Sequence, residues 1–256
     1  MHIRILGAHN CESQNSRFAS VLIDDVLAID AGGLTSSLSF SAQQGLKAIL
    51  LTHQHYDHVR DIPAVAMNLF LQGATINVYC TRTVYQALAS HLLDGALYPK
   101  FQEKPEADPT VKFTVIEPYQ LEKIEGYDVL AVPVNHGDGA VGYQVTSPHG
   151  ETVFYAGDTG PGLTECWERV APQLLVIEVT LPDRYQEYAA QSRHLTPVLL
   201  RQELTAFFRL KGYLPEVMAI HMNPTMEREI EPEIAEVARA LDISISLACE
   251  GLELEL

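Results

Sequence analysis

Short apolar runs alternate with polar and turn-forming segments along the whole chain. In the first part of the chain, four runs are rich in aliphatic and β-branched residues and predict strands. They are "HIRIL" (2–6), "ASVLI" (19–23), "VLAID" (26–30) and "LKAILLT" (46–52). Asp61 with Pro63 just after it predicts a helix start, and the apolar stretch that follows predicts a helix up to Gly73.

In the second part of the chain, strand-like runs end in polar residues. These runs are "VLAVPV" (129–134) before Asn135 and His136, "TVFYAG" (152–157) before Asp158, "LLVIE" (174–178) ending at Glu178, and "VMAI" (217–220) before His221. Further segments, 197–210 and 227–241, predict helices. Strand clusters followed by helices in both parts predict an α/β fold of two mixed β-sheets packed face to face, with helices on the outer faces.

No Pro/Gly/Ser-rich linker and no internal repeat divides the chain. The polar, proline-bearing segment 98–110 is typical of a surface loop within a domain. We therefore expect residues 1–256 to form a single domain.

The segment that follows the strand 46–52 is the densest cluster of potential metal ligands. It reads "HQHYDH", from His53 to His58. In an extended chain, side chains two positions apart project to the same side, so His53 and His55 can bind one metal ion together. A turn at Tyr56 would bring Asp57 and His58 to an adjacent position. The alternative is a solvated histidine cluster on a loop, but a buried strand before it and a helix start after it favour a metal site.

Composition and charge narrow the class of substrate. The chain has a formal net charge of −16 and a pI near 4.9, whereas proteins that bind long nucleic acids usually carry a basic surface. No apolar run reaches the roughly 18 residues of a membrane span, and the start shows no signal-peptide pattern. We expect a cytoplasmic protein. Its four cysteines form no CxxC pair, so neither a disulfide framework nor a thiolate zinc site is expected.

The "HQHYDH" motif resembles the HxHxDH signature of the metallo-β-lactamase superfamily. Later segments match that family in order: "VNHGDGAVGYQV" with His136, "VFYAGDTGPG" with Asp158, and "AIHMNP" with His221. The resemblance implies a four-layer αββα sandwich. It also implies two divalent transition-metal ions, with zinc preferred and manganese or iron as alternatives. One ion would be held by His53, His55 and His136, the other by Asp57, His58 and His221, with Asp158 bridging both.

Taken alone, each distant ligand has an ordinary structural interpretation. His136 or His221 could be a satisfied core or surface histidine, and Asp158 could be a turn aspartate. Asp30 in "AIDAGG" is expected beside the site. The remaining histidines lie in no such context and are assigned no role; they are His2, His9, His91 and His149.

Two further segments resemble the phosphodiesterase branches of this superfamily, namely RNase Z-like and class II cyclic-nucleotide phosphodiesterase-like proteins. They are "VIEVTLP" (176–182) and "SRHLTP" (192–197). The resemblance implies that Glu178 supports His194, which assists the leaving group, and Asp57 completes the catalytic set. Arg193 stands where the phosphodiesterase-like proteins have glycine. The alternative for His194 is a residue that merely precedes a helix capped by Thr196.

We therefore expect a dinuclear metal-dependent hydrolase that cleaves small phosphodiesters, such as cyclic nucleotides, with a metal-bridging hydroxide. The alternatives are a lactone or thioester hydrolase of the same fold, or a metal-binding scaffold or sensor without turnover. The expected partner is a small molecule, without long nucleic acid or membrane. No long insertion is available for the basic tRNA-binding arm of RNase Z. A homodimer is compatible with these features.

Overall fold

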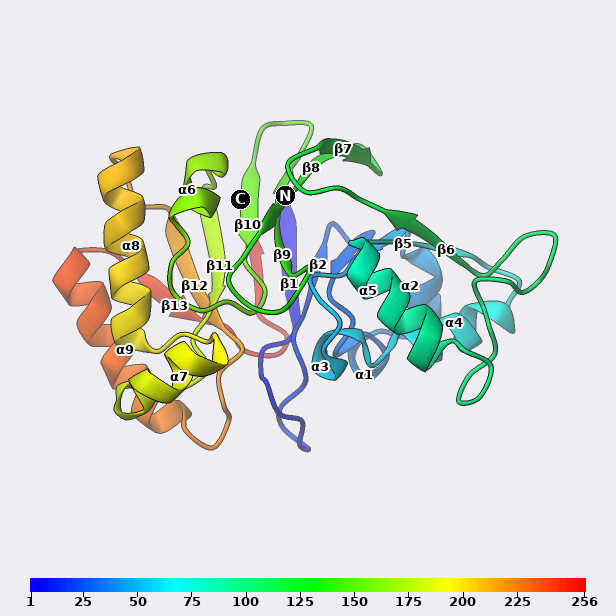
Figure 1. Ribbon diagram of the computed structural model, residues 1–256, viewed down its shortest axis with the longest axis horizontal. Coiled ribbons are helices and arrows are strands. Elements are labelled where there is room, and N and C mark those ends of the chain that lie inside the picture. The colour runs from blue at the N-terminus through cyan, green and yellow to red at the C-terminus, as the bar shows by residue number, and fades with distance from the viewer.

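The computed structural model describes all residues, 1–256, and contains two seven-stranded mixed β-sheets packed face to face (Figure 1). Helices cover the outer face of each sheet, so the four layers are helix, sheet, sheet and helix. The predicted αββα sandwich is confirmed.

The first sheet has the strand order β14-β1-β2-β3-β4-β5-β6. Its strands are β1 (His2–Gly7), β2 (Ser20–Ile23), β3 (Leu27–Ile29), β4 (Ala48–Leu50), β5 (Ile76–Cys80), β6 (Val111–Val115) and β14 (Glu253–Glu255). The pairs from β14 to β3 are antiparallel, and those from β3 to β6 are parallel.

The second sheet has the order β13-β12-β11-β10-β9-β8-β7. Its strands are β7 (Leu121–Ile124), β8 (Tyr127–Pro133), β9 (Val141–Thr146), β10 (Thr152–Tyr155), β11 (Leu174–Glu178), β12 (Glu216–Ile220) and β13 (Ile245–Leu247). The pairs from β7 to β10 are antiparallel, and those from β10 to β13 are parallel.

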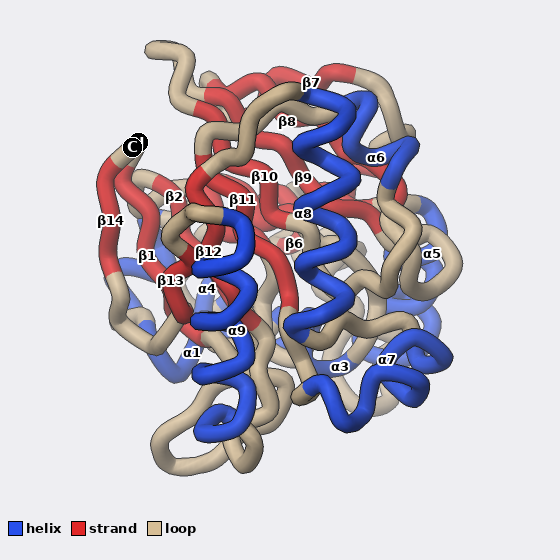
Figure 2. Tube along the Cα trace, turned by 90° about the vertical axis from the view of Figure 1, so that its left-hand side faces the viewer, coloured by secondary structure: helices blue, strands red, loops and turns tan.

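The helices divide between the two outer faces. Those of the first half are α1 (Leu34–Ser37), α2 (Phe40–Gly45), α3 (Tyr56–Val59), α4 (Ile62–Phe70) and α5 (Arg82–Ala87), which continues into a π-helical turn η1 (Leu88–Leu92). Those of the second half are α6 (Thr164–Arg169), the 3₁₀ turn η2 (Asp183–Tyr185), α7 (Gln186–Ser192), α8 (Pro197–Lys211) and α9 (Glu227–Leu241). Figure 2 shows α8 and α9 side by side in front of the second sheet.

Three apolar clusters fill the spaces between the layers. The cluster between the two sheets draws on both halves of the chain, with Ile29 and Leu50 from the first sheet and Tyr143 and Val176 from the second. The other two clusters join each sheet to its own helices. Because the side chains of the inner strands β2, β3, β4, β10 and β11 face either the central cluster or a helix layer, these strands are buried along their whole length and are rich in aliphatic residues on both faces.

Six strands have their carboxyl ends along one edge of the sandwich. They are β3, β4, β8, β10, β11 and β12. In Figure 1 this edge faces the lower side, where α3 and α7 lie. The polar residues that end these strands in the sequence are thereby brought to a common edge.

Several predicted boundaries differ from the observed ones. The predicted strand 46–52 is observed only over Ala48–Leu50, because Thr52 donates its backbone N–H to the Asp30 carboxylate instead of to a neighbouring strand. The predicted helix up to Gly73 ends at Phe70 in a short turn. The predicted helix 197–210 extends one residue further, to Lys211, before Gly212 adopts a left-handed conformation.

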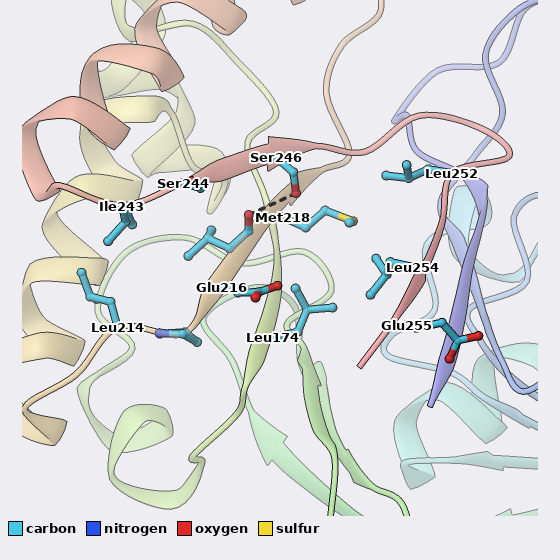
Figure 3. A pocket seen from close by; sticks show the side chains of 12 residues that line it. Leu174, Leu214, Glu216, Met218, Ile243, Ser244, Ser246, Leu252, Leu254 and Glu255 are labelled. Carbon is cyan, nitrogen blue, oxygen red and sulfur yellow. Dashed lines mark hydrogen bonds between the residues drawn. The ribbon is translucent and has the colours of Figure 1, made fainter.

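An apolar groove of about 630 Å³ is lined by residues of β12 and β13 from the second sheet and of β14 from the first. Figure 3 shows Leu174, Met218 and Leu254 among the side chains that line this groove. It contains none of the residues predicted to bind metal. None of the helices combines the length and the apolar character that crossing a bilayer requires.

Candidate metal centre

The structure brings the seven predicted metal ligands together in two groups that share one residue. The first group is His53, His55, His136 and Asp158, and the second is Asp57, His58, Asp158 and His221. In each group, one ligand atom per residue lies within 4.8 Å of the others. His and Asp clusters of this kind fit a divalent metal site.

The chain path after β4 places the first four predicted ligands, which are His53, His55, Asp57 and His58. His53 and His55 lie in an extended segment, as predicted from their spacing. At Tyr56 the chain enters α3, so the predicted turn is the first turn of a short helix. That turn carries Asp57 and His58 beside the extended segment, and the His53 and His58 rings lie with centroids 4.2 Å apart.

Asp158, which follows β10, lies between the two groups. Its Oδ2 is 3.7 Å from His53 Nε2 and 3.8 Å from His136 Nε2. Its Oδ1 is 3.2 Å from His58 Nε2 and 3.3 Å from His221 Nε2. One carboxylate oxygen therefore faces each group, which is the arrangement that a bridging ligand needs.

Asp30, at the end of β3, orients the histidines of the first sheet. It accepts hydrogen bonds from His58 Nδ1 at 2.7 Å and from the Thr52 hydroxyl at 2.9 Å. Because the Thr52 hydroxyl donates to Asp30, its oxygen can accept a hydrogen bond from His53 Nδ1, 3.0 Å away. In the neutral form of each ring, Nε2 is then the unprotonated nitrogen, and it faces the space beside Asp158.

Glu178, at the end of β11, has the same function in the second sheet. It accepts the Thr180 hydroxyl at 2.6 Å, and Thr180 Oγ1 lies 2.9 Å from His221 Nδ1. It also pairs directly with His194 Nδ1 at 2.7 Å. The backbone N–H groups of Thr159 and Leu195 complete its hydrogen bonds. His221 Nδ1 therefore donates to Thr180, and its Nε2 is left for a ligand.

Three buried polar atoms in the site have no hydrogen-bond partner in the protein. They are His53 Nε2, His58 Nε2 and Asp158 Oδ1. An unpaired buried polar group costs on the order of 1–3 kcal/mol, so three in one place call for a ligand that satisfies them together. All three face the shared space between the groups, and a divalent cation matches their lone pairs. The residues present therefore fit the metal ions implied by the fold.

Burial and neighbouring charges together shift the pKa values of these groups. Burial, reinforced by the neighbouring His58, holds the pKa of His53 well below 6.5. Burial tends to raise the pKa of Asp158, but His221 and His58 outweigh it and hold that pKa well below the ordinary value. A neutral imidazole and an ionised carboxylate are the forms that bind metal.

The pKa of His58 shifts in the opposite direction. Burial tends to lower it, but the Asp158 and Asp30 carboxylates raise the pKa well above 6.5. Since the protonated ring cannot bind a metal ion, binding there has to displace a proton. At His194, burial again tends to lower the pKa, and Glu178 outweighs it and raises the pKa to about 9.

Asp30 and His221 both have left-handed backbone conformations, with φ of 59° and 65°. Such φ values are uncommon outside glycine and concentrate at functional sites. Backbone hydrogen bonds from Asp30 N to Leu50 O and from His221 N to Ala8 O hold the two turns. The turns direct each side chain inward from the end of its strand.

The sequence missed several residues of the site. Thr52 and Thr180 act through hydroxyl groups whose partners lie on other segments, so no local pattern marks them. His9 was assigned no role, and the structure places it outside the cluster, buried between Glu250 and Glu227. Asp30 lies beside the site as expected.

Comparisons with known proteins identify the family and the fold. A family model described as "Beta-lactamase superfamily domain" matches residues 20–222. The structure is similar to yeast PDE1, with a TM-score of 0.85 at 16% identity, covering 100% of this chain and 99% of that one. It is also similar to the short form of human tRNase Z (TM-score 0.69, 18% identity, 100% and 99% covered).

A diphosphatase from the PhnP family has a TM-score of 0.69 at 18% identity, with 100% of this chain and 97% of that one covered. A comparison with curated protein sequences finds no match. At these identities the structural similarities show the fold.

Zinc should bind to the folded protein and stabilise it, because the unfolded chain has no assembled site. With free zinc at about 100 times its dissociation constant, the gain is about 2.7 kcal/mol per site, measurable by thermal unfolding and removable with a chelator. We expect about two zinc equivalents per chain by metal analysis. His53→Ala should reduce both the zinc content and the stabilisation, whereas His149→Ala, in an exposed turn, should change neither. A His53→Ala protein that binds two equivalents as tightly as the parent would contradict the assignment.

Thr180→Val should weaken metal binding while keeping the shape of the side chain. The substitution removes the hydroxyl that links Glu178 to His221 Nδ1, and loss of such an orienting partner typically costs about 10–100-fold in metal affinity. Competition with a chromophoric chelator measures the affinity. Thr205→Val, which removes a hydroxyl bonded to Arg201 O on the outer helix α8, is the control. Equal zinc affinities for both variants would show that the Thr180 hydroxyl does not orient His221.

Proposed function

The chain belongs to the beta-lactamase superfamily, and from this membership and the His/Asp cluster we propose that it is a dinuclear metal-dependent hydrolase of small phosphodiesters, such as cyclic nucleotides. His53, His55 and His136 are the proposed ligands of one ion. Asp57, His58 and His221 are those of the other, and Asp158 bridges both. Two bound divalent ions would activate water and stabilise the charge on the reacting phosphate. Zinc is the proposed metal because imidazole and carboxylate ligands suit it.

One observation supports the phosphodiesterase assignment most strongly: the Glu178–His194 pair at the edge of the metal cluster. Glu178 Oε1 and His194 Nδ1 are 2.7 Å apart, and the carboxylate is fully buried. The His194 ring stacks on the His221 ring at a centroid distance of 5.9 Å and lies 5.0 Å from the His136 ring. A residue with this support and position can act on a group bound at the cluster.

His194 has one ring nitrogen free for this purpose. Its Nδ1 faces Glu178, and its Nε2 makes no hydrogen bond within the protein. A ring held by a carboxylate through Nδ1 can donate a proton from Nε2 to a departing alkoxide. Phosphodiesters with poor leaving groups need such a donor, whereas a metal-binding scaffold without turnover does not. Asp57, beside His221 at 3.2 Å, completes the proposed catalytic set.

The substrate is proposed to be small because of the charge of the chain. A net charge of −16 gives little of the phosphate neutralisation on which long nucleic acids depend for affinity. The fold is shared with both a tRNase Z and a diphosphatase, so the fold does not choose between a large and a small substrate.

We also propose that the 256 residues form one domain. The central apolar cluster supports this, because it draws on strands from both halves of the chain.

His194→Ala should separate substrates by their leaving groups. A positioned acid contributes roughly 10²–10⁴-fold when the leaving group is poor, and far less for nitrophenolate, whose charge is delocalised. We expect a rate loss in that range on nucleoside or alkyl phosphodiesters, a smaller loss on bis-p-nitrophenyl phosphate, and retention of both metal ions. Glu178→Gln should show a milder form of the same selectivity.

The measurement is the ratio of variant to parent rates across leaving groups of different pKa, with the metal content determined for each sample. His91→Ala, on the exposed π-helical turn, is the matched control. Equal losses on good and poor leaving groups would assign His194 to phosphate binding. Preferential turnover of lactones or thioesters by the parent protein would overturn the phosphodiesterase proposal itself.

Binding to tRNA or duplex DNA should be weak at moderate salt, because the net charge of −16 leaves little phosphate neutralisation and counterion release to drive it. A titration at several salt concentrations, followed by fluorescence anisotropy, measures both the affinity and its salt dependence. Tight binding that weakens steeply with salt would contradict a small substrate and favour an RNA-processing function.

A further inference from the structure

Arg193 occupies an unusual backbone position next to the proposed catalytic histidine. It ends α7 and directly precedes His194, with φ of 59° and ψ of 52° in the left-handed region. Glycine adopts this conformation without strain, and an arginine there is disfavoured unless other contacts offset the strain. The position is the one where the phosphodiesterase-like resemblance has glycine.

Arg193 contacts the metal-ligand candidate His136 at both its ring and its backbone. The Arg193 carbonyl oxygen accepts a hydrogen bond from His136 Nδ1 at 2.9 Å, and Arg193 Nη1 donates to the carbonyl oxygen of His136. The first contact leaves Nε2 as the unprotonated nitrogen of His136, on the side of Asp158. The second fixes the backbone from which that ring projects.

The loops around this contact are packed too closely to rearrange independently. Gly160 lies against Arg193, where an added Cβ would come within 2.8 Å of the Arg193 Cα. Gly160 N in turn donates to Asn135 O at 2.7 Å, and Asn135 Nδ2 donates to Pro161 O at 2.6 Å. The segments after β8, β10 and α7 therefore meet at Arg193, and these three segments carry His136, Asp158 and His194.

We propose that Arg193 is a positioning residue that holds His136 in the geometry and tautomer required for metal binding. The inference rests on the proposed ligand role of His136. It extends the proposed function by linking the metal ligands to the His194 segment through one residue, by its backbone carbonyl and its guanidinium. The guanidinium contact with His136 O offsets the cost of a left-handed arginine.

Positioning by Arg193 and charge repulsion by its guanidinium predict opposite changes in metal affinity when the side chain is removed. A guanidinium close to a cation site repels the cation, so removing its charge should tighten metal binding if charge were its only contribution. If Arg193 acts by positioning, removing it should weaken metal binding. The sign of the change in affinity therefore distinguishes the two mechanisms.

Arg193→Gly is the decisive variant, because glycine keeps the left-handed turn and the backbone carbonyl but removes the guanidinium contact. We expect zinc affinity to fall by about 10-fold, at the lower end of the effect of losing an orienting partner. The visible spectrum of the Co²⁺-substituted protein should change, since it reports ligand geometry. The melting temperature of the metal-free protein should stay equal or rise, because glycine relieves backbone strain.

Asp242→Gly is a matched control, since Asp242, like Arg193, ends a helix in a left-handed conformation, with φ of 53°, outside the metal cluster. It should leave the zinc affinity and the Co²⁺ spectrum unchanged. Arg193→Lys keeps a cationic donor of similar reach and should recover part of the affinity.

Zinc affinity that is unchanged or higher in Arg193→Gly, with an unchanged Co²⁺ spectrum, would overturn the inference. These measurements use no substrate, so they are independent of whether phosphodiesters are hydrolysed. A parent protein that turns over no phosphodiester, together with a 10-fold weaker Arg193→Gly, would refute the proposed function and support the positioning role.

Discussion

A carboxylate buried away from water is stable only when hydrogen-bond donors surround it, and the site depends on two such groups, Asp30 and Glu178. Both are fully buried. Asp30 accepts hydrogen bonds from Thr52 and His58, and Glu178 accepts them from Thr180, His194 and two backbone N–H groups. To meet this requirement the chain has to hold hydroxyl and imidazole donors in fixed orientations. The histidines are thereby oriented before any metal ion binds.

In both sheets, the same arrangement of side chains supplies hydrogen-bond donors to the buried carboxylate. In the first sheet, the order of contacts is Asp30, Thr52 hydroxyl and His53; in the second, it is Glu178, Thr180 hydroxyl and His221. Each carboxylate also contacts one histidine directly, His58 in one case and His194 in the other. The direct partners differ in their surroundings, because His58 faces Asp158 whereas the Nε2 of His194 has no protein partner. Similar local chemistry thus supports a proposed ligand on one side and a proposed acid on the other.

The sequence predicted the features that are encoded locally. The spacing in "HQHYDH" and the polar ends of four later strands identified the residues that the structure gathers, and alternating strand and helix patterns predicted the sandwich. The individual hydrogen bonds between distant segments could not be predicted, apart from the Glu178–His194 pair that the family resemblance implied. The hydroxyl of Thr180 looks like that of any strand-end threonine until its distance to His221 is known. Arg193 looked like a departure from the family pattern, and only its backbone angle and its contact with His136 give it a structural meaning.

The division of Asp158 between the two ligand groups has a consequence for metal loading. Because Oδ2 faces one group and Oδ1 the other, an ion bound in either group would fix the carboxylate plane for both. A second ion would then meet a carboxylate that is already ordered, while mutual repulsion between the two cations would act against its binding. By reciprocity, whichever effect is larger couples the two occupancies equally in both directions. The ratio of the first to the second stepwise binding constant would therefore depend on the balance between ordering of this carboxylate and repulsion between the two cations.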